Sequence, residues 1–440
     1  MSVITRLQRL TGDDGKTPGG ENGQKSKSEE LLRLRARIDA ILSQRPERQK
    51  TNVQQPAECG RRVPIEELVA GKEMTNEAGS FFCSRHMAKG SLSHGRFCVQ
   101  DLSLLDMSRL AVLGNDSALL GLDYRQALFF DTETTGIAGG TGTVPFLIGL
   151  GWFEEDAFIT RQLFARDYGE ERAILIGLRE LLKGKRFLIS FNGKAFDANL
   201  LAARFIMNRM PDPLAGLAHL DLLHPARRLL KHRMPDCRLA SLEAVLLGFE
   251  RRGDVPGSEI PQRYFNWLRR RDGRLMADVF THNRQDILSL AGLAAHLSQV
   301  LDPDAESTGC HPDDRLAAAR LFLARGCPDQ AVRLLSSLAG CACQETAWNA
   351  ARELSFYYKR TEQWPAAVAI WEDLASRDGN DLFALIELAK WCEHHRRDFT
   401  RALALVERAC AHGRSLSAED FAELAHRRER LERKINGGKN

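Results

Sequence analysis

Hydrophobic and polar positions alternate between strand-like and helix-like patterns from about residue 121 to residue 300. Short apolar runs of strand length are followed by longer segments in which apolar residues recur at helical spacing. The predicted strands are Ala127–Phe130, Val144–Phe153, Ala157–Phe164, Phe187–Phe191 and His219–Leu223, and the predicted helices are Glu170–Leu182, Asn199–Asn208 and Met276–Leu297. Strands that alternate with helices in this way predict an α/β domain, and the acidic turn Glu154-Glu155-Asp156 predicts that Val144–Phe153 and Ala157–Phe164 form a hairpin.

The pattern changes after residues 302–314, where the composition shifts to Ala, Leu, Arg and Trp. The pairs Ala331-Val332, Ala367-Val368 and Ala402-Leu403 recur at intervals of 36 and 35 residues. This period predicts helical hairpins stacked over residues 312–436, and it resembles tetratricopeptide repeats without their full consensus. Such helices either bind a protein partner or pack on the α/β domain.

The first 120 residues have weaker patterns. Residues 1–60 are rich in Gly, Lys, Glu, Gln and Arg, so we expect most of them to be disordered, except for a short amphipathic helix over Ser28–Ser43. Residues 61–120 contain two short strand-like runs, Phe81–Cys83 and Phe97–Val99. We expect this segment to be a lead-in that packs on the domain at 121–300.

Composition narrows the class of protein. A chain of 440 residues has room for two or three domains, and its net charge of +4 says little about partners. Apolar runs are too short for a membrane span, and residues 1–20 lack the apolar core of a signal peptide. The ten cysteines include no Cys-x-x-Cys, so we expect reduced thiols and a cytoplasmic protein without a membrane partner.

The candidate chemistry lies at the end of the first apolar strand. Asp131 and Glu133 are two residues apart, so both side chains leave the strand on the same face. Two carboxylates held that close repel each other unless a cation lies between them. Oxygen ligands of this kind predict a site for Mg²⁺ or Mn²⁺.

The motifs together resemble the ribonuclease H-like 3′–5′ exonucleases of the DEDD superfamily. The segment Asp131-Thr-Glu-Thr-Thr-Gly136 resembles their first motif, Asn192-Gly-Lys-Ala-Phe-Asp197 the second, and His282-Asn-Arg-Gln-Asp286 the third. Within that superfamily the likeness is closest to the YprB-type proteins, which often carry tetratricopeptide-like helices after the nuclease domain. The resemblance implies a mixed sheet flanked by helices, followed by an all-α repeat domain.

The resemblance also implies roles for individual residues. Asp131, Glu133, Asp197 and Asp286 would hold two divalent ions that assist hydrolysis of a phosphodiester bond. His282 would be the general base, because a histidine side chain can take up a proton near neutral pH. The chain departs from the family here, since His282 precedes Asp286 by four residues, which is the spacing of the Tyr subgroup. A supporting role beside the ligands therefore stays open for His282.

The substrate side depends on charge and on the residues beside the motifs. Between the second and third motifs the chain is basic, which either forms a solvated face or binds nucleic-acid phosphates. The predicted substrate contacts are Thr134, Asn192, Phe196, Arg227, Arg228 and Lys231. For Asn192 and Phe196 a turn cap and a core packing role are equal alternatives.

The sequence thus predicts a metal-dependent nuclease, most simply a 3′–5′ exonuclease acting on an end of single-stranded DNA or RNA. The alternative is a catalytically weak scaffold that binds nucleic acid and recruits a protein partner through its helical repeats. The presence of all four carboxylates favours the enzyme.

Overall fold

The computed structural model of the chain describes residues 62–90, 92–136, 142–304, 309–377, 381–411 and 418–437. The disorder and the helix predicted within residues 1–60 lie outside this range. Residues 137–141, which include Gly139 and Gly140, also lie outside it. No helix within the described part is long and apolar enough to cross a membrane.

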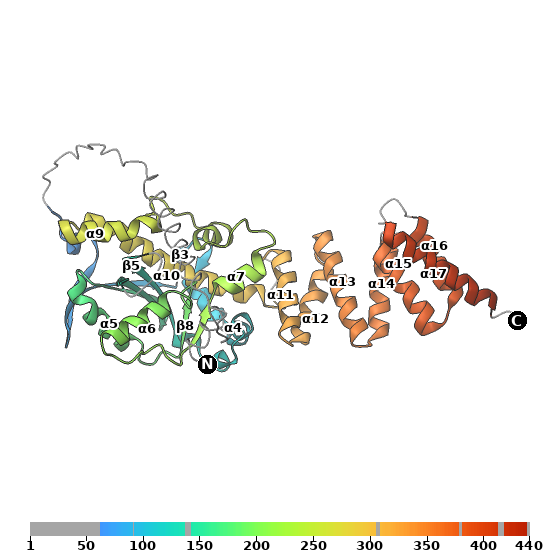
Figure 1. Cartoon of the computed structure of the whole chain (residues 1–440), viewed down its shortest axis with the longest axis horizontal. Coiled ribbons are helices and arrows are strands. Elements are labelled where there is room, and N and C mark those ends of the chain that lie inside the picture. Colours follow the sequence, from blue (N-terminus) through green and yellow to red (C-terminus); the bar gives the residue numbers. More distant parts are fainter. Residues whose placement is uncertain are drawn as a thin grey trace, which may run out of the picture. The chain divides into compact units, whose positions relative to one another are not determined.

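A seven-stranded mixed sheet forms the centre of the α/β part (Figure 1). Its strands, in spatial order, are β1 (Gly71–Asn76), β2 (Gly79–Lys89), β7 (Ala157–Phe164), β6 (Pro145–Glu154), β5 (Ala127–Thr134), β8 (Phe187–Ser190) and β9 (Ala218–Asp221). Strands β8 and β9 run parallel to β5, and the other neighbours are antiparallel. The predicted β6–β7 hairpin and the predicted mixed sheet are confirmed.

Helices cover both faces of this sheet, as Figure 1 shows. Helices α5 (Glu171–Leu181) and α6 (Asp197–Met207) pack on one face through Ile174, Leu178 and Phe205. Helices α9 (Ile260–Arg270) and α10 (Arg274–Val300) cover the other face. Strand alternation explains the division, because Leu128 and Phe130 face α5 and α6 whereas Phe129 belongs to the α10 side.

Residues 61–120 contribute more to the domain than the expected lead-in. Strand β2 is eleven residues long and pairs with β7 over eight residues, so the sheet begins well before residue 121. The second predicted strand is short, and pairs as β4 (Phe97–Cys98) with β3 (Ser93–His94) in a separate small sheet. Helix α4 (Met107–Gly114) then packs in the same core as Phe187 and Leu220.

The region after residue 309 is almost entirely helical. Its helices are α11 (Pro312–Ala324), α12 (Pro328–Ala339), α13 (Gln344–Arg360), α14 (Trp364–Arg377), α15 (Leu382–Trp391), α16 (Phe399–Ala411) and α17 (Ala418–Gly437). Each contacts the next along the chain. Leu316 of α11 and Leu334 of α12 share one core with Leu290 of α10, so the first helices of this region are packed on the α/β part.

A buried ion pair strengthens the same junction. Asp314 of α11 is fully buried, and Arg233, just after helix α7 (Leu223–Leu230), donates from Nε to its Oδ1 at 2.7 Å. Because an unpaired buried carboxylate is costly, this bond holds α7 and α11 in one arrangement.

Candidate metal and nucleic-acid site

The two strand acids lie where strand alternation places them. Asp131 and Glu133 share the face of β5 that carries Phe129, and this face is covered by α10. Thr132, between them, points to the opposite face, where α6 begins. The end of β5 therefore presents carboxylates to one helix and a hydroxyl to another.

Helix α10 approaches the sheet closely because strand β6 carries glycine beneath it. A Cβ at Gly149 would lie 2.1 Å from Oδ1 of Asn283, and a Cβ at Gly151 would lie 2.4 Å from Ile287. Asn283 is fully buried and bridges two strands, since its Oδ1 accepts from Gln162 of β7 at 3.0 Å and its Nδ2 donates to Asp131 at 3.0 Å. The amide thus fixes the position of the Asp131 carboxylate.

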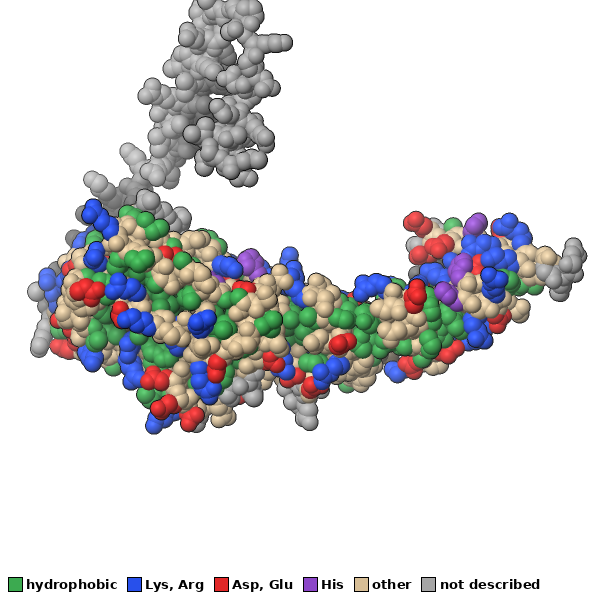
Figure 2. Space-filling model, turned by 90° about the horizontal axis from the view of Figure 1, so that it is seen from below, with side chains coloured by type: hydrophobic (Ala, Val, Ile, Leu, Met, Phe, Trp, Pro, Cys, Tyr) green, Lys and Arg blue, Asp and Glu red, His purple; other side chains and the backbone are tan. Residues whose placement is uncertain are grey.

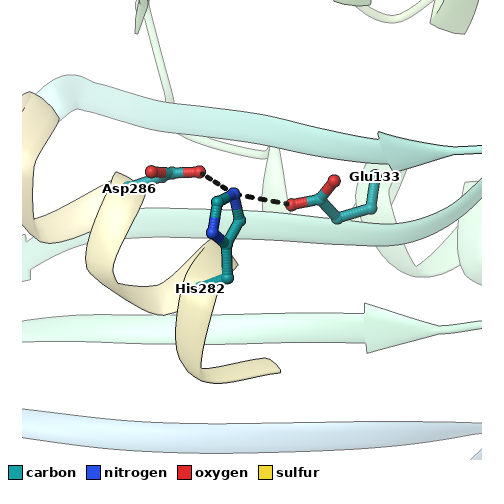
Figure 3. A group of neighbouring side chains, drawn as sticks. All are labelled: Glu133, His282 and Asp286. Atoms are coloured by element: carbon teal, nitrogen blue, oxygen red, sulfur yellow. Dashed lines mark ion pairs between the residues drawn. The ribbon is translucent and has the colours of Figure 1, made fainter. Parts of the chain in front are cut away.

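Three side chains from β5 and α10 converge on one point (Figure 3). Nε2 of His282 lies 3.9 Å from Oε1 of Glu133 and 3.4 Å from Oδ2 of Asp286. His282 and Asp286 are four residues apart and so occupy the same face of α10. One ligand atom from each of the three residues lies within 4.8 Å of the others, which is close enough to surround a metal ion.

Asp197 reaches the site from the first residue of α6. Its Oδ1 accepts a hydrogen bond from the hydroxyl of Thr132, the residue between the two strand acids. Its charge contributes to raising the pKa values of Asp131 and Glu133. The three motifs, which lie far apart in the sequence, therefore meet at the end of β5, with Asp197 on the α6 side and Asp286 on the α10 side.

The other nitrogen of His282 faces a fifth carboxylate. Nδ1 lies 2.7 Å from Oδ1 of Asp254 and 3.2 Å from Nη1 of Arg251. The shorter contact is to the carboxylate, so we assign the Nδ1 proton to the bond with Asp254 and leave the lone pair of Nε2 toward the site. Although burial alone would raise the pKa of Asp254, the bond with His282 and the charge of Arg251 keep it below its usual value.

Arg251 is a buried cation at the edge of the carboxylates. Its side chain is 8% exposed, and Glu243, at 1%, accepts from Nε at 2.7 Å and from Nη2 at 2.5 Å. The same Nη2 donates to Oδ1 of Asp286. Arg251 thereby neutralises Glu243 and also occupies one oxygen of a predicted metal ligand.

The surroundings of the four carboxylates disfavour their ionised form and raise their pKa values. Burial, followed by the charges of Asp286 and Asp197, raises the pKa of Asp131 well above its usual value. Burial and the charge of Asp131 do the same for Glu133. Burial also raises the pKa of Asp197 and of Asp286, where Arg251 opposes the rise. Clustered carboxylates of this kind mark functional sites more often than ordinary surfaces.

The donor set fits hard divalent cations. Four carboxylates at the end of one strand supply the oxygen ligands that Mg²⁺ and Mn²⁺ prefer. Burial is the main cause of the raised pKa values of Asp131 and Glu133, and the charges of the neighbouring carboxylates add to it while Arg251 opposes it. Cations would remove the repulsion among these carboxylates, so the residues present fit such ions.

The predicted substrate residues are divided between the site and its surroundings. Phe196 is 54% exposed beside Asp197, so it has no core packing role and is open to a ligand. Asn192 lies in a turn with φ of 64°, and its backbone N–H donates to Asp221 at 2.7 Å. The hydroxyl of Thr134 donates to the carbonyl of Gly136 at 2.8 Å, which is a local turn contact.

The basic run between the second and third motifs does not act as one surface. Arg227, Arg228 and Lys231 are exposed on or next to α7. Arg233 is bound to Asp314, and Arg251 belongs to the carboxylate site. On the face drawn in Figure 2, basic and acidic side chains are interspersed, so a patch of one sign has to be located residue by residue.

Sequence reasoning missed Asp254, Glu243 and Asn283. Asn283 carried a signal, because it directly follows His282 on the helix that was predicted to bear the third motif. Asp254 and Glu243 carried none, since their role depends on how the segment before α9 folds back to α10.

Three comparisons identify known proteins that are similar to this chain. A family model described as the ribonuclease H superfamily matches residues 128–298. The YprB protein of Bacillus subtilis (strain 168) is 33% identical over 349 residues, which cover 78% of this chain and 83% of the relative. Among solved structures, a family B DNA polymerase from the hyperthermophilic archaeon Pyrobaculum calidifontis matches 47% of this chain at 16% identity with a TM-score of 0.34. That match covers 29% of the polymerase.

Proposed function

From the premise that this chain belongs to the YprB family and contains a ribonuclease H superfamily domain, we propose that it is a metal-dependent nuclease. The finer proposal is a 3′–5′ exonuclease that hydrolyses single-stranded DNA or RNA from an end. The observation that carries the proposal is that a carboxylate oxygen of Glu133 and one of Asp286, which come from distant parts of the chain, lie within 4.8 Å of each other, with a ring nitrogen of His282 equally close.

The carboxylates of Asp131, Glu133, Asp197 and Asp286 would hold Mg²⁺ or Mn²⁺, two ions by the resemblance described above. Such ions, when bound, make a coordinated water more acidic and stabilise charge on the oxygens of a phosphodiester. Asn283 keeps Asp131 in place, and the hydroxyl of Thr132 does the same for Asp197. The chain itself therefore sets the geometry of the ligands.

His282 is the proposed general base. With its Nδ1 proton directed to Asp254, Nε2 can take a proton from the attacking water, and the imidazolium that forms is stabilised by the Asp254 carboxylate. Phe196, exposed next to Asp197, offers a ring on which the terminal base can stack.

One observation favours the second candidate function, a nucleic-acid-binding scaffold with weak catalysis. Arg251 donates to Oδ1 of Asp286, and this oxygen would otherwise be free to bind an ion. While this bond is present, Oδ1 of Asp286 is not free to bind a cation, so the site binds a second ion more weakly.

The test compares three purified full-length proteins: the unaltered chain, Asp131→Asn and Glu155→Gln. Asp131→Asn keeps the size of the side chain and removes its charge. Glu155 is an exposed carboxylate in the β6–β7 turn and serves as the matched control. Each protein is incubated with Mn²⁺ and single-stranded DNA or RNA labelled at the 5′ end, and products are resolved at single-nucleotide length.

The unaltered chain and Glu155→Gln should shorten the labelled strand stepwise from its 3′ end, and chelation of the metal should stop the reaction. Asp131→Asn should lose at least about 100-fold in rate, as expected when a group central to transition-state stabilisation is removed. Equal cleavage by all three proteins would refute the nuclease. If none cleaves while all bind the strand, the scaffold is the correct function.

A further inference from the structure

A basic cavity lies beside the turn that carries the second motif. Its volume is about 390 Å³, and its walls come from the end of α4, the 192–194 turn, β9, α7 and the residue that ends α11. The basic side chains that line it, here called the basic pocket, are Lys194, His219, His224, Arg227, Arg228 and Arg325. Burial lowers the pKa of His219 to about 4, so this side chain is neutral at pH 7 and the positive charge comes from Lys194, Arg227, Arg228 and Arg325.

The guanidinium groups of this pocket have no counter-ions. Among the described residues, Arg227, Arg228 and Arg325 form neither an ion pair nor a side-chain hydrogen bond, in contrast to Arg233 nearby, which is bound to Asp314. Nε of Arg325 is buried without any hydrogen-bond partner. A buried donor left in this state costs free energy, so a ligand that accepts its hydrogen bond would be stabilised.

The single carboxylate of the cavity is already committed. Oδ1 of Asp221 accepts from the backbone N–H of Asn192 at 2.7 Å and of Leu223 at 3.1 Å. Its Oδ2 accepts from the backbone N–H of Lys194 at 3.0 Å. Asp221 therefore holds the motif turn and the start of α7, and it does not pair with the basic pocket.

Helix ends explain only part of the arrangement. Arg227 and Arg228 lie in the last turn of α7, and Arg325 ends α11, where cations interact favourably with the helix dipole. That effect stabilises each cation alone and falls off within one turn. It does not explain why cations from two helix ends and from Lys194 converge on the same cavity, where they repel one another.

The spacing on α7 indicates a chain of anions and not a single one. His224, Arg227, Arg228 and Lys231 follow one another at i, i+3, i+4 and i+7, so they form a stripe on the exposed face about 10 Å long. Lys194, at the other end, lies three residues before Asp197 of the carboxylate site. The stripe and the pocket share His224, Arg227 and Arg228, and the pocket is bordered by Arg325 next to the last residue of α11.

We propose that the basic pocket binds the phosphate backbone of single-stranded nucleic acid, and that Arg325 makes the first helices after residue 309 part of this binding surface. The proposal relies on the proposed function for the identity of the strand as a substrate. The shared core of α10, α11 and α12 supports it, because Arg325 then has a fixed position relative to α7.

The experiment measures binding without cleavage. A fluorescein-labelled 15-nucleotide oligo-dT or oligo-rU is titrated with full-length protein in EDTA at several salt concentrations, and anisotropy gives the association constant. The variants are Arg325→Ala, Arg227→Ala/Arg228→Ala, the triple combination and Arg325→Lys. The control is Lys72→Ala, an exposed cation on β1, at the opposite edge of the sheet from β9.

Each lost phosphate contact should reduce the slope of log K against log salt by about 0.7, because single strands release about 0.7 counter-ion per neutralised phosphate. At 0.1 M salt this corresponds to about fivefold weaker binding for Arg325→Ala and about 100-fold for the triple variant. Arg325→Lys should keep most of the slope, and Lys72→Ala should keep all of it. Equal thermal unfolding midpoints establish that the variants are folded.

An unchanged slope in the folded triple variant would overturn the proposal, and so would a loss as large in Lys72→Ala. These outcomes are independent of the nuclease proposal. Cleavage with an unchanged slope refutes the pocket alone, whereas a reduced slope without cleavage refutes the nuclease and keeps the pocket as a nucleic-acid site.

Discussion

Replacing Arg251 by Met tests whether its guanidinium stabilises the folded chain by compensating the buried carboxylates around it. The substitution preserves an unbranched side chain of similar length but removes every donor. Glu243, whose side chain is 1% exposed, then loses both of its bonds to the guanidinium, at 2.7 and 2.5 Å. Asp286 loses its bond to Nη2 at the same time.

The expected cost comes from the carboxylates left behind. Breaking a buried ion pair by removing one partner costs about 3–5 kcal/mol, because the remaining charge stays buried without compensation. In Arg251→Met/Glu243→Leu both partners are apolar, and such replacements are often close to neutral. The double variant should therefore recover most of the stability, apart from the share that belongs to Asp286 and to Asp254, which loses a bond from Nη1 at 3.1 Å.

Urea unfolding in EDTA and in Mn²⁺ separates the part of the free-energy cost that comes from Glu243 from the part that comes from Asp286. Mn²⁺ should restore the share due to Asp286, since an ion bound there replaces the missing guanidinium, whereas it cannot reach Glu243 behind the site. Arg251→Met should thus gain more stability from Mn²⁺ than the unaltered chain does. A cost below about 1 kcal/mol for the single variant would refute the reasoning, because a surface pair has that value.

Three further predictions follow from other contacts. Asp254→Asn should lower kcat for strand cleavage by about 10- to 100-fold with KM unchanged, as expected for a group that orients a catalytic side chain, here His282; a change in KM alone would contradict it. Gly149→Ala should cost about 1–3 kcal/mol in urea unfolding, because its Cβ would overlap an amide of α10, whereas Gly257→Ala, with open space around it, should be neutral. Burial alone would raise the pKa of Glu393, but hydrogen bonds from basic side chains of α17 lower it to about 2. The stabilising effect of the Glu393 carboxylate is therefore complete above pH 4.5 and is lost as the pH falls toward 2. The loss of thermal stability in Glu393→Gln should accordingly be large at pH 7 and shrink over that range; a constant difference would contradict it.

The parts of the fold that local sequence determines were predicted. The apolar lead-in to Asp131, the β6–β7 hairpin and the α10 helix each follow from periodicity within one segment, and the structure has all of them within a few residues. The pairing of β2 with β7 was not predicted, because sheet neighbours depend on contacts between segments that are far apart in sequence.

The candidate site likewise contains residues that local motifs predicted and residues whose role depends on contacts between distant segments. The positions of Glu133, His282 and Asp286 were expected from motifs, each of which is short and local. Arg251 lies in the basic stretch between the second and third motifs, which was expected either to form a solvated face or to bind phosphates, whereas the structure has it buried against Glu243. Charge along a sequence does not say which face a side chain takes, and burial converts a cation from a substrate contact into an internal counter-ion.

The carboxylate site links metal binding to the stability of the whole α/β part. Burial and mutual repulsion raise the pKa values of Asp131 and Glu133, so with both acids ionised the folded chain is less stable than the same chain with neutral groups there. Two features hold the site together despite this cost. Gly149 and Gly151 of β6 leave room for α10 to pack closely on the sheet, and Asn283 donates a hydrogen bond to Asp131. A cation that binds the folded site and not the unfolded chain returns free energy in proportion to its affinity. With the proposed ions bound, the residues that make the site costly without them would make the stability of the folded state depend on those ions.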